Sequence, residues 1–187
     1  MPLKRIVSAL ALCAPVLAFA HPGDGSLLHD HGALAGFLHP FTGADHLAVM
    51  LAVGLWSAMV QRGRMVLVAP ISFAALLLVG ALAGMAGLAL PMVEPLVAAS
   101  VLVLGLLIAA RFELGAAASA ALVGAFALFH GLAHGAELQG YGALAGMVAA
   151  TALLHAAGIA LGLKLSPKVT RAAGAGIAVL GLALVFA

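Results

Sequence analysis

The chain has 187 residues, of which 65% are hydrophobic and only 7% charged, and its mean hydropathy is +1.25. Soluble globular domains carry about 25% charged residues and disordered chains are more polar still, so the composition excludes both classes. The formal net charge is +2 at pH 7, and the sequence has no basic run or zinc-finger spacing, which argues against a nucleic-acid partner.

The first 20 residues have the three parts of a secretory signal peptide. Lys4 and Arg5 are positively charged, residues 6–17 are apolar, and residues 18–20 form an A-x-A cleavage site. The alternative is an uncleaved transmembrane helix, but a span needs about 20 apolar residues, and a polar segment follows at once. We therefore predict cleavage after residue 20, which also removes the single cysteine, Cys13.

Residues 21–40 are predicted to be a periplasmic segment rich in His and Asp. Cleavage makes His21 the first residue of the mature chain, and the run His29-Asp30-His31 follows. The α-amine and the imidazole of an N-terminal histidine can chelate one metal ion together. We therefore consider His21, His29 and His31 candidate metal ligands; the alternative is a flexible polar tail in which the histidines are incidental.

Apolar runs separated by short polar breaks predict six transmembrane helices in residues 41–187. We place these helices at residues 41–60, 66–90, 95–111, 115–135, 141–163 and 168–186. The sequence thus predicts an all-α membrane protein with a signal peptide (1–20), an N-terminal segment (21–40) and a six-helix transmembrane domain (41–187). If the six helices form two sets of three, the second set must cross the membrane in the opposite orientation, because three is odd. Two inverted three-helix halves are therefore a further hypothesis, although the two halves show no residue-level similarity.

Positive charge is confined to alternate loops once the signal peptide is removed. The first, third and fifth loops hold all six remaining basic residues, which are Arg62, Arg64, Arg111, Lys164, Lys168 and Arg171. Positively charged loops stay in the cytoplasm, so both mature termini are predicted to be periplasmic in a bacterial inner membrane. A cleaved signal peptide delivers the mature N-terminus to the same side.

Two short runs contain most of the ionisable residues within the predicted helices. The run 39–46 opens the first helix, and the run 129–137 closes the fourth. His130 and His134 are four residues apart, so both imidazoles project from one helical face, which Glu137 extends if the helix continues. An Asp at the centre of a span costs about 2.5–3.5 kcal/mol, so ionisable groups in such helices indicate a function.

Asp45 and His46 are adjacent and therefore about 100° apart on a regular helix. Either Asp45 is not a ligand itself and instead orients His46, or the backbone is irregular there and both side chains reach the same site. Pro40 and Gly43 make an irregular backbone possible. Both runs lie in the outer half of the membrane, since His130 is about 22 Å along the fourth helix at 1.5 Å per residue. Imidazoles with carboxylates suit Zn, Ni, Cu and Co. The candidate ligands of one site are His39, Asp45, His46, His130, His134 and Glu137.

Two of these candidate ligands also have a structural alternative. His155, about 21 Å from the outer end of the fifth helix, lies in the inner half of the membrane. It is either a further metal ligand or a hydrogen-bonded packing residue. Glu137 is either a ligand or a residue of the outer loop.

The two runs resemble the HupE/UreJ family of nickel permeases. The pattern H-P-x-x-G-x-D-H occurs in residues 39–46 and F-H-G-x-A-H-G-x-E in residues 129–137, and a histidine follows the predicted cleavage site. The resemblance covers essentially the whole chain. It implies six mature helices, uptake of Ni²⁺ or Co²⁺, and a link to the maturation of nickel enzymes. The metal-handling residues that it implies are His39, Asp45, His46, His130, His134 and Glu137.

The sequence therefore predicts a secondary transporter or channel-like permease rather than an enzyme, with no cofactor beyond the transported ion. Ni²⁺ is favoured, while Co²⁺, Zn²⁺ and Cu²⁺ stay open. An integral-membrane zinc-dependent hydrolase is the main alternative, because a His/Asp site also activates water, although the H-E-x-x-H pattern is absent. A passive metal sensor is a third. The predicted partners are the metal ion and the lipid bilayer, and a homo-oligomer stays open.

Overall fold

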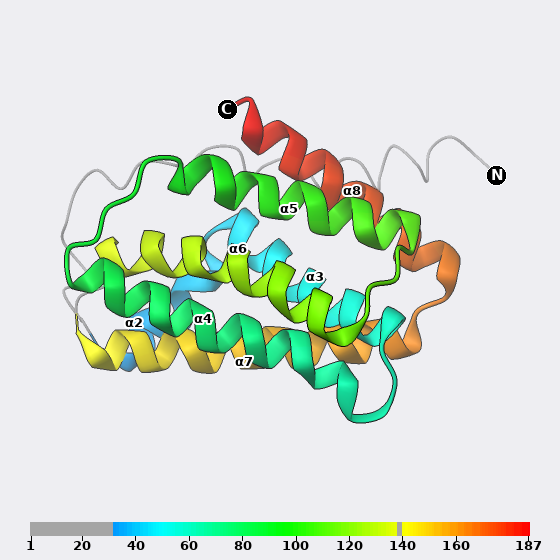
Figure 1. Cartoon of the computed structure of the whole chain (residues 1–187), viewed down its shortest axis with the longest axis horizontal. Helices are drawn as coiled ribbons and strands as arrows, with labels where there is room; N and C mark the ends of the chain where they lie inside the picture. The colour runs from blue at the N-terminus through cyan, green and yellow to red at the C-terminus, as the bar shows by residue number, and fades with distance from the viewer. Residues whose placement is uncertain (1–31, 138–139) are drawn as a thin grey trace.

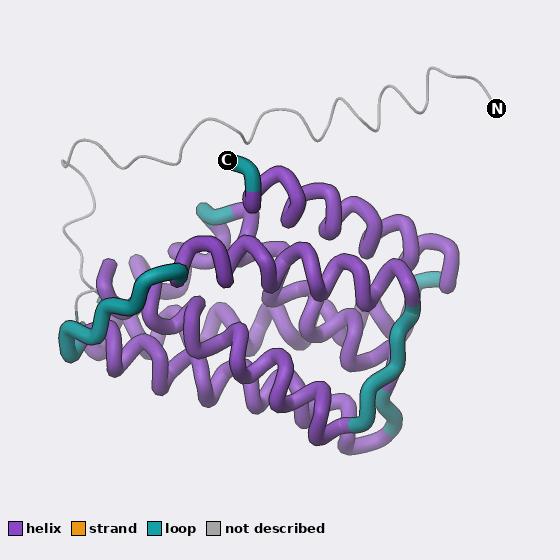
Figure 2. Tube along the Cα trace, turned by 45° about the horizontal axis from the view of Figure 1, so that its top comes forward, coloured by secondary structure: helices purple, strands orange, loops and turns teal. Residues whose placement is uncertain are grey.

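The computed structural model describes residues 32–137 and 140–187, and every regular element in these ranges is a helix (Figures 1 and 2). The α-helices are α2 (Ala33–Leu38), α3 (Ala44–Val60), α4 (Val68–Met85), α5 (Val93–Ala110), α6 (Ala116–Glu137), α7 (Tyr141–Lys164) and α8 (Pro167–Val185). Two 3₁₀ helices, η1 (His39–Phe41) and η2 (Gly63–Leu67), precede α3 and α4. The predicted signal peptide and three candidate ligands, His21, His29 and His31, lie outside the described residues.

Five helices are long and apolar enough to cross a membrane, and a bent pair, residues 33–41 with 44–60, makes a sixth if it is counted as one span. The prediction of an all-α membrane protein is confirmed. The first helix differs from the prediction, because its two parts meet at 84°. Pro40, which cannot donate a backbone hydrogen bond, lies in η1, and Gly43 is extended at φ −99° and ψ 124°.

α2 lies in the part of the chain for which the sequence predicts only a polar segment. It packs against the start of α7. A Cβ at Gly36 of α2 would collide with the backbone of Ala143, and a Cβ at Gly146 of α7 would collide with that of Ala33. The two helix backbones are therefore in direct contact, as small residues allow in lipid, and this contact anchors the chain just before His39.

The second predicted helix is shorter than expected. α4 ends at Met85 rather than at residue 90, because Gly87 adopts a left-handed conformation with φ of 88°. α5 then begins at Val93, two residues before the predicted start. Pro95 lies in its first turn, where no intrahelical N–H bond is required.

The three most extensive helix pairs form an arrangement that is unchanged when the two halves are exchanged. The first half is α3, α4 and α5, and the second is α6, α7 and α8. α3 packs along α7 and α4 packs along α6, while α5 packs along α8 (Figure 1). Exchanging the halves converts the first pair into the second and the third into itself.

Matching glycines hold these three pairs in the same register. In each pair, a Cβ on either glycine would collide with the backbone of the residue three positions before the other glycine. The glycine pairs are Gly54 with Gly158, Gly80 with Gly131, and Gly105 with Gly181. Each pair therefore joins one helix of the first half to one of the second at the same residue offset, through carbonyl oxygens in the first two pairs and backbone nitrogens in the third. This pairing agrees with two inverted three-helix halves, which stay a hypothesis.

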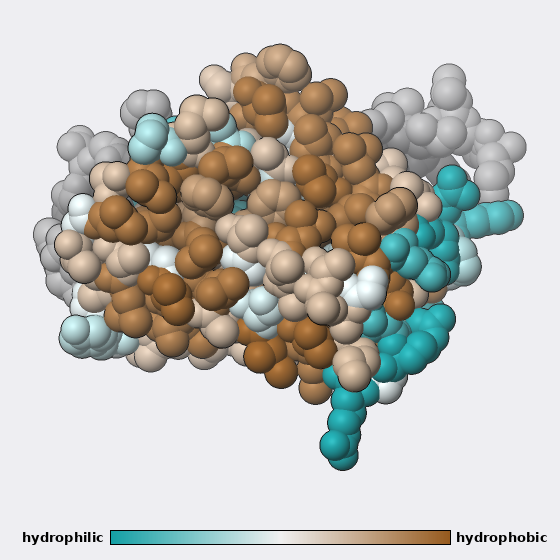
Figure 3. All heavy atoms as spheres, viewed as in Figure 1, coloured by the Kyte–Doolittle hydropathy of each residue, from teal (hydrophilic) through white to brown (hydrophobic). Residues whose placement is uncertain are grey.

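Charge is distributed unequally between the two ends of the bundle. The loops that follow α3, α5 and α7 lie at one end, and hydrophilic side chains gather there (Figures 1 and 3). These loops and the adjacent helix ends carry exposed cations, which are Arg62, Arg64, Arg111, Lys164, Lys168 and Arg171. The start of α3 and the end of α6 lie at the opposite end.

Candidate metal centre

The last turns of α6 supply three of the predicted residues. His130 and His134 are fully buried, with exposures of 0% and 1%. α6 continues to Glu137, so the predicted extension of this helical face is confirmed. The Glu137 side chain is 65% exposed, which places the carboxylate at the rim of the site.

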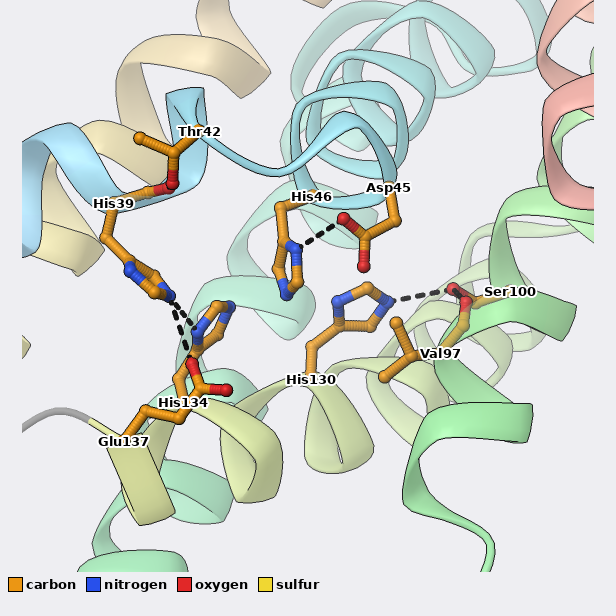
Figure 4. Close-up of polar contacts among 9 residues, drawn as sticks. All are labelled: His39, Thr42, Asp45, His46, Val97, Ser100, His130, His134 and Glu137. Atoms are coloured by element: carbon orange, nitrogen blue, oxygen red, sulfur yellow. Dashed lines mark hydrogen bonds and ion pairs between the residues drawn. The ribbon is translucent and has the colours of Figure 1, made fainter. Parts of the chain in front are cut away.

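His39 joins this face from η1, beside the bend in the chain. Its Nε2 lies 2.8 Å from Nδ1 of His134 and 3.5 Å from Oε2 of Glu137 (Figure 4). Ligand atoms of the three residues all lie within 4.8 Å of one another, close enough to hold one metal ion. The contact with His39 holds the pKa of Glu137 below its ordinary value of 4.5, although partial burial opposes this shift. Glu137 is therefore a carboxylate at neutral pH.

Asp45 and His46 form the first turn of α3. Nδ1 of His46 lies 2.8 Å from Oδ1 of Asp45. A carboxylate only accepts hydrogen bonds, so Nδ1 carries the ring hydrogen and Nε2 holds the lone pair. The sequence leaves two alternatives open for this pair, and the structure has features of both. Asp45 contacts and orients His46, and the backbone before α3 is bent.

Three buried ring nitrogens in this cluster have no hydrogen-bond partner. They are Nε2 of His46, Nδ1 of His130 and Nε2 of His134. The ring of His46 lies 4.2 Å from that of His134 and 5.2 Å from that of His130, measured between centroids. Figure 4 shows the three rings converging between α3 and α6. Buried polar atoms without a partner are rare. A buried imidazole nitrogen that holds the lone pair, as Nε2 of His46 does, suits a divalent transition metal ion.

His155 lies on α7, outside the cluster. Its side chain is 3% exposed, and its Nε2 has no hydrogen-bond partner. The ring of Phe73 lies 5.2 Å from that of His155 and 5.8 Å from that of His130. Phe73, which the sequence analysis does not identify, is therefore in contact with both histidines.

A cleft with a volume of about 650 Å³ borders the cluster. It lies between the loop before α5, the first turn of α3 and the last turns of α6. Asp45, His46 and Glu137 line it together with Glu94, the first acidic residue after Asp45 in the chain. The sequence analysis does not identify Glu94, although its position between two prolines at a predicted helix start is a usable signal. It also misses Ser100, whose Oγ lies 2.8 Å from Nε2 of His130.

The comparisons with known proteins cover almost the whole chain. Residues 9–184 match the family model described as HupE / UreJ protein. The chain is also similar to Protein HupE of Rhizobium leguminosarum bv. viciae, with 41% identity over 193 residues and coverage of 98% of each chain. No solved structure matches it.

Proposed function

This chain belongs to the HupE/UreJ family, and on that premise we propose that it is a permease for the uptake of a divalent transition metal ion. Ni²⁺ is the favoured substrate and Co²⁺ the second candidate, because the two motifs resemble those of nickel permeases. The ion is cargo rather than a resident cofactor, and we assign no catalytic residue. The zinc-hydrolase alternative has no observation in its favour, and we do not propose it.

The observation that carries this proposal is the set of three unpartnered ring nitrogens on His46, His130 and His134. A neutral imidazole nitrogen with a lone pair is the commonest metal ligand in proteins. Carboxylates beside the rings offset the charge of the ion, and the nearest are Asp45 and Glu137. His39 contacts both His134 and Glu137 and completes the site on the side of η1.

The positions of the polar groups suggest a path through the bundle. The ion would enter the cleft lined by Asp45, Glu94 and Glu137, and pass to the histidine cluster. His155 would be the next ligand. Phe73, which contacts both His130 and His155, is the side chain that must move between these two positions.

We extend the path outward to the N-terminal segment. In the proposed orientation both mature termini are periplasmic, and His21, His29 and His31 collect the ion there. The protein then resides in the bacterial inner membrane and supplies metal for the maturation of nickel enzymes. Its partners are the ion and the surrounding lipid, with a homo-oligomer as a further proposal.

Uptake into proteoliposomes tests the proposal, with Ni²⁺, Co²⁺, Zn²⁺ and Cu²⁺ compared at equal concentration. We expect saturable uptake of Ni²⁺. His130→Ala and His134→Ala should each reduce uptake to background while circular dichroism stays helical, because each removes a ligand and leaves the backbone hydrogen bonds of the helices in place. His155→Ala should slow transport more than it weakens binding. Normal uptake by an Asp45→Ala, His46→Ala, His134→Ala triple variant would refute the proposal.

A further inference from the structure

Ser100, in the middle of α5, contacts the cluster from a helix that carries none of the predicted ligands. Ser100 and His130 are both 0% exposed. Oγ of Ser100 lies 2.8 Å from Nε2 of His130 and 2.6 Å from the carbonyl oxygen of Val97 (Figure 4). The hydroxyl is therefore shared between one backbone group and one imidazole.

The hydrogens of this pair follow from the valence of each group. A serine hydroxyl has one hydrogen, and a carbonyl oxygen has none. Two oxygens 2.6 Å apart require a hydrogen between them, so Ser100 donates to Val97. Oγ can then only accept from His130, and Nε2 must carry the ring hydrogen. The lone pair is left on Nδ1, which is the buried nitrogen of His130 without a partner.

We propose that Ser100 is a positioning residue that holds His130 in the tautomer with hydrogen on Nε2, so that His130 binds the metal ion through Nδ1. Asp45 has the corresponding effect on His46. Its carboxylate accepts a hydrogen bond from Nδ1–H of His46, which leaves the lone pair on Nε2. Without Ser100, His130 is free to carry hydrogen on Nδ1, which would turn a ligand into a donor. Metal binding in this proposal depends on the proposed function, whereas the tautomer does not.

The tautomer is measurable in metal-free protein. In detergent micelles at neutral pH, ¹⁵N NMR of the histidine-labelled full chain separates protonated from unprotonated ring nitrogens. Signals of His130 are those lost in His130→Gln. We expect hydrogen on Nε2 in the wild type. Hydrogen on Nδ1 would overturn the proposal, whatever the variants do and whether or not the chain transports metal.

Variants of Ser100 test the consequence for binding. Ser100→Ala removes the acceptor, so the His130 signals should shift toward the other tautomer and Ni²⁺ affinity should fall by about 10–100-fold, the usual effect of losing a residue that orients a ligand. Ser100→Thr retains the hydroxyl and should restore both.

The matched control is Ser57→Ala, because Ser57 is a buried helical serine that donates to the carbonyl oxygen of Val66. It should change neither the tautomer nor the affinity. Equal losses of affinity in Ser57→Ala and Ser100→Ala, or an unchanged tautomer in Ser100→Ala, would contradict the proposal. A wild type with the expected tautomer and Ni²⁺ affinity but no uptake would instead refute the proposed function and leave the role of Ser100 intact.

Discussion

Glu94 adds a third carboxylate to the cleft, beside Asp45 and Glu137. A cleft lined by one sign of charge raises the local concentration of the opposite ion. Glu94→Gln, which keeps the shape and removes the charge, should therefore raise the Ni²⁺ concentration for half-maximal uptake by roughly 3–10-fold. The effect should shrink at high salt, because salt screens exposed charges.

Glu113→Gln is the control for this variant. It makes the same change of charge on an exposed residue that follows α5, at the opposite end of the bundle. Uptake kinetics at two ionic strengths should leave Glu113→Gln at the wild-type value. Equal shifts in the two variants would mean that net charge, and not the cleft, controls uptake.

Binding should also depend on pH, because protons compete with the metal ion for the ring nitrogens. Affinity for Ni²⁺ should fall as the pH is lowered, because a protonated imidazole has no lone pair for the metal ion. Glu137 stays ionised near neutral pH, since its pKa lies below 4.5. Calorimetry on Glu137→Gln should thus show weaker binding with the same pH dependence as the wild type. If Glu137→Gln removed the pH dependence of Ni²⁺ affinity, the proton that competes with the ion would be the one on Glu137.

Individual residues differ in how far the sequence identifies them. His130 and His134 are recognisable because ionisable residues are rare in apolar helices and their four-residue spacing defines one face. Ser100 is not, because serine is an ordinary residue of an apolar helix. Its role arises only from α5 lying beside α6, and hydropathy does not determine which helices are neighbours.

Among the elements, the glycine contacts between helices lead to a prediction on stability. A Cβ at Gly131 would lie 2.7 Å from the backbone nitrogen of Ala81 and 2.9 Å from Cα of Gly80, so Gly131→Ala must push α4 and α6 apart. Overpacking of this kind costs about 1–3 kcal/mol. Gly54→Ala, at the matching place between α3 and α7, should lower the free energy of unfolding by a comparable amount.

Gly176→Ala provides the comparison on α8, because no atom lies within 4 Å of the added Cβ. Replacing an exposed helical glycine by alanine stabilises a helix by about 1 kcal/mol. Unfolding followed by circular dichroism should rank Gly176→Ala at or above the wild type and the other two variants below it. A Gly131→Ala variant as stable as Gly176→Ala would contradict the close approach of α4 and α6.

Helix positions follow from the sequence more closely than helix shapes do. Apolar runs locate all six long helices to within a few residues, because polar and turn-forming residues separate them. α2 is missed because it is only six residues long and lies among polar residues. The bend before α3 depends on the backbone conformation of Gly43, and the early end of α4 depends on that of Gly87. Neither conformation alters the apolar pattern.

At the level of the whole molecule, the orientation in the membrane is the prediction to test. The loops with the basic residues should be cytoplasmic and the C-terminus periplasmic. In intact cells, a membrane-impermeant maleimide should label Ala187→Cys, whereas Gly115→Cys should react only after permeabilisation. Gly115 is suitable because nothing lies within 4 Å of an added Cβ. The opposite labelling pattern would reverse the proposed orientation.

The hypothesis of two inverted halves depends on helix contacts that the sequence alone does not give. Helix number alone permits the hypothesis, but the two motifs occur once each and give no similarity between the halves. The equivalence lies in which glycine faces which across each helix pair, as for Gly54 with Gly158 and Gly80 with Gly131. Such pairs are recognisable only when the neighbouring helices are known, since glycine is frequent throughout the chain.

The opposite charges at the two ends of the bundle have an electrical consequence. With the acidic cleft outside and the basic loops inside, a membrane voltage that is negative inside acts along the path of the ion. It contributes about 2.3 kcal/mol per elementary charge at 100 mV, so a divalent ion gains about 4.6 kcal/mol on crossing. Since about 1.4 kcal/mol corresponds to a factor of ten, this voltage alone sustains an accumulation of more than about a thousandfold. For the proposed permease the membrane voltage is thus a sufficient driving force, and the current of the ion would run inward because the cell interior is negative.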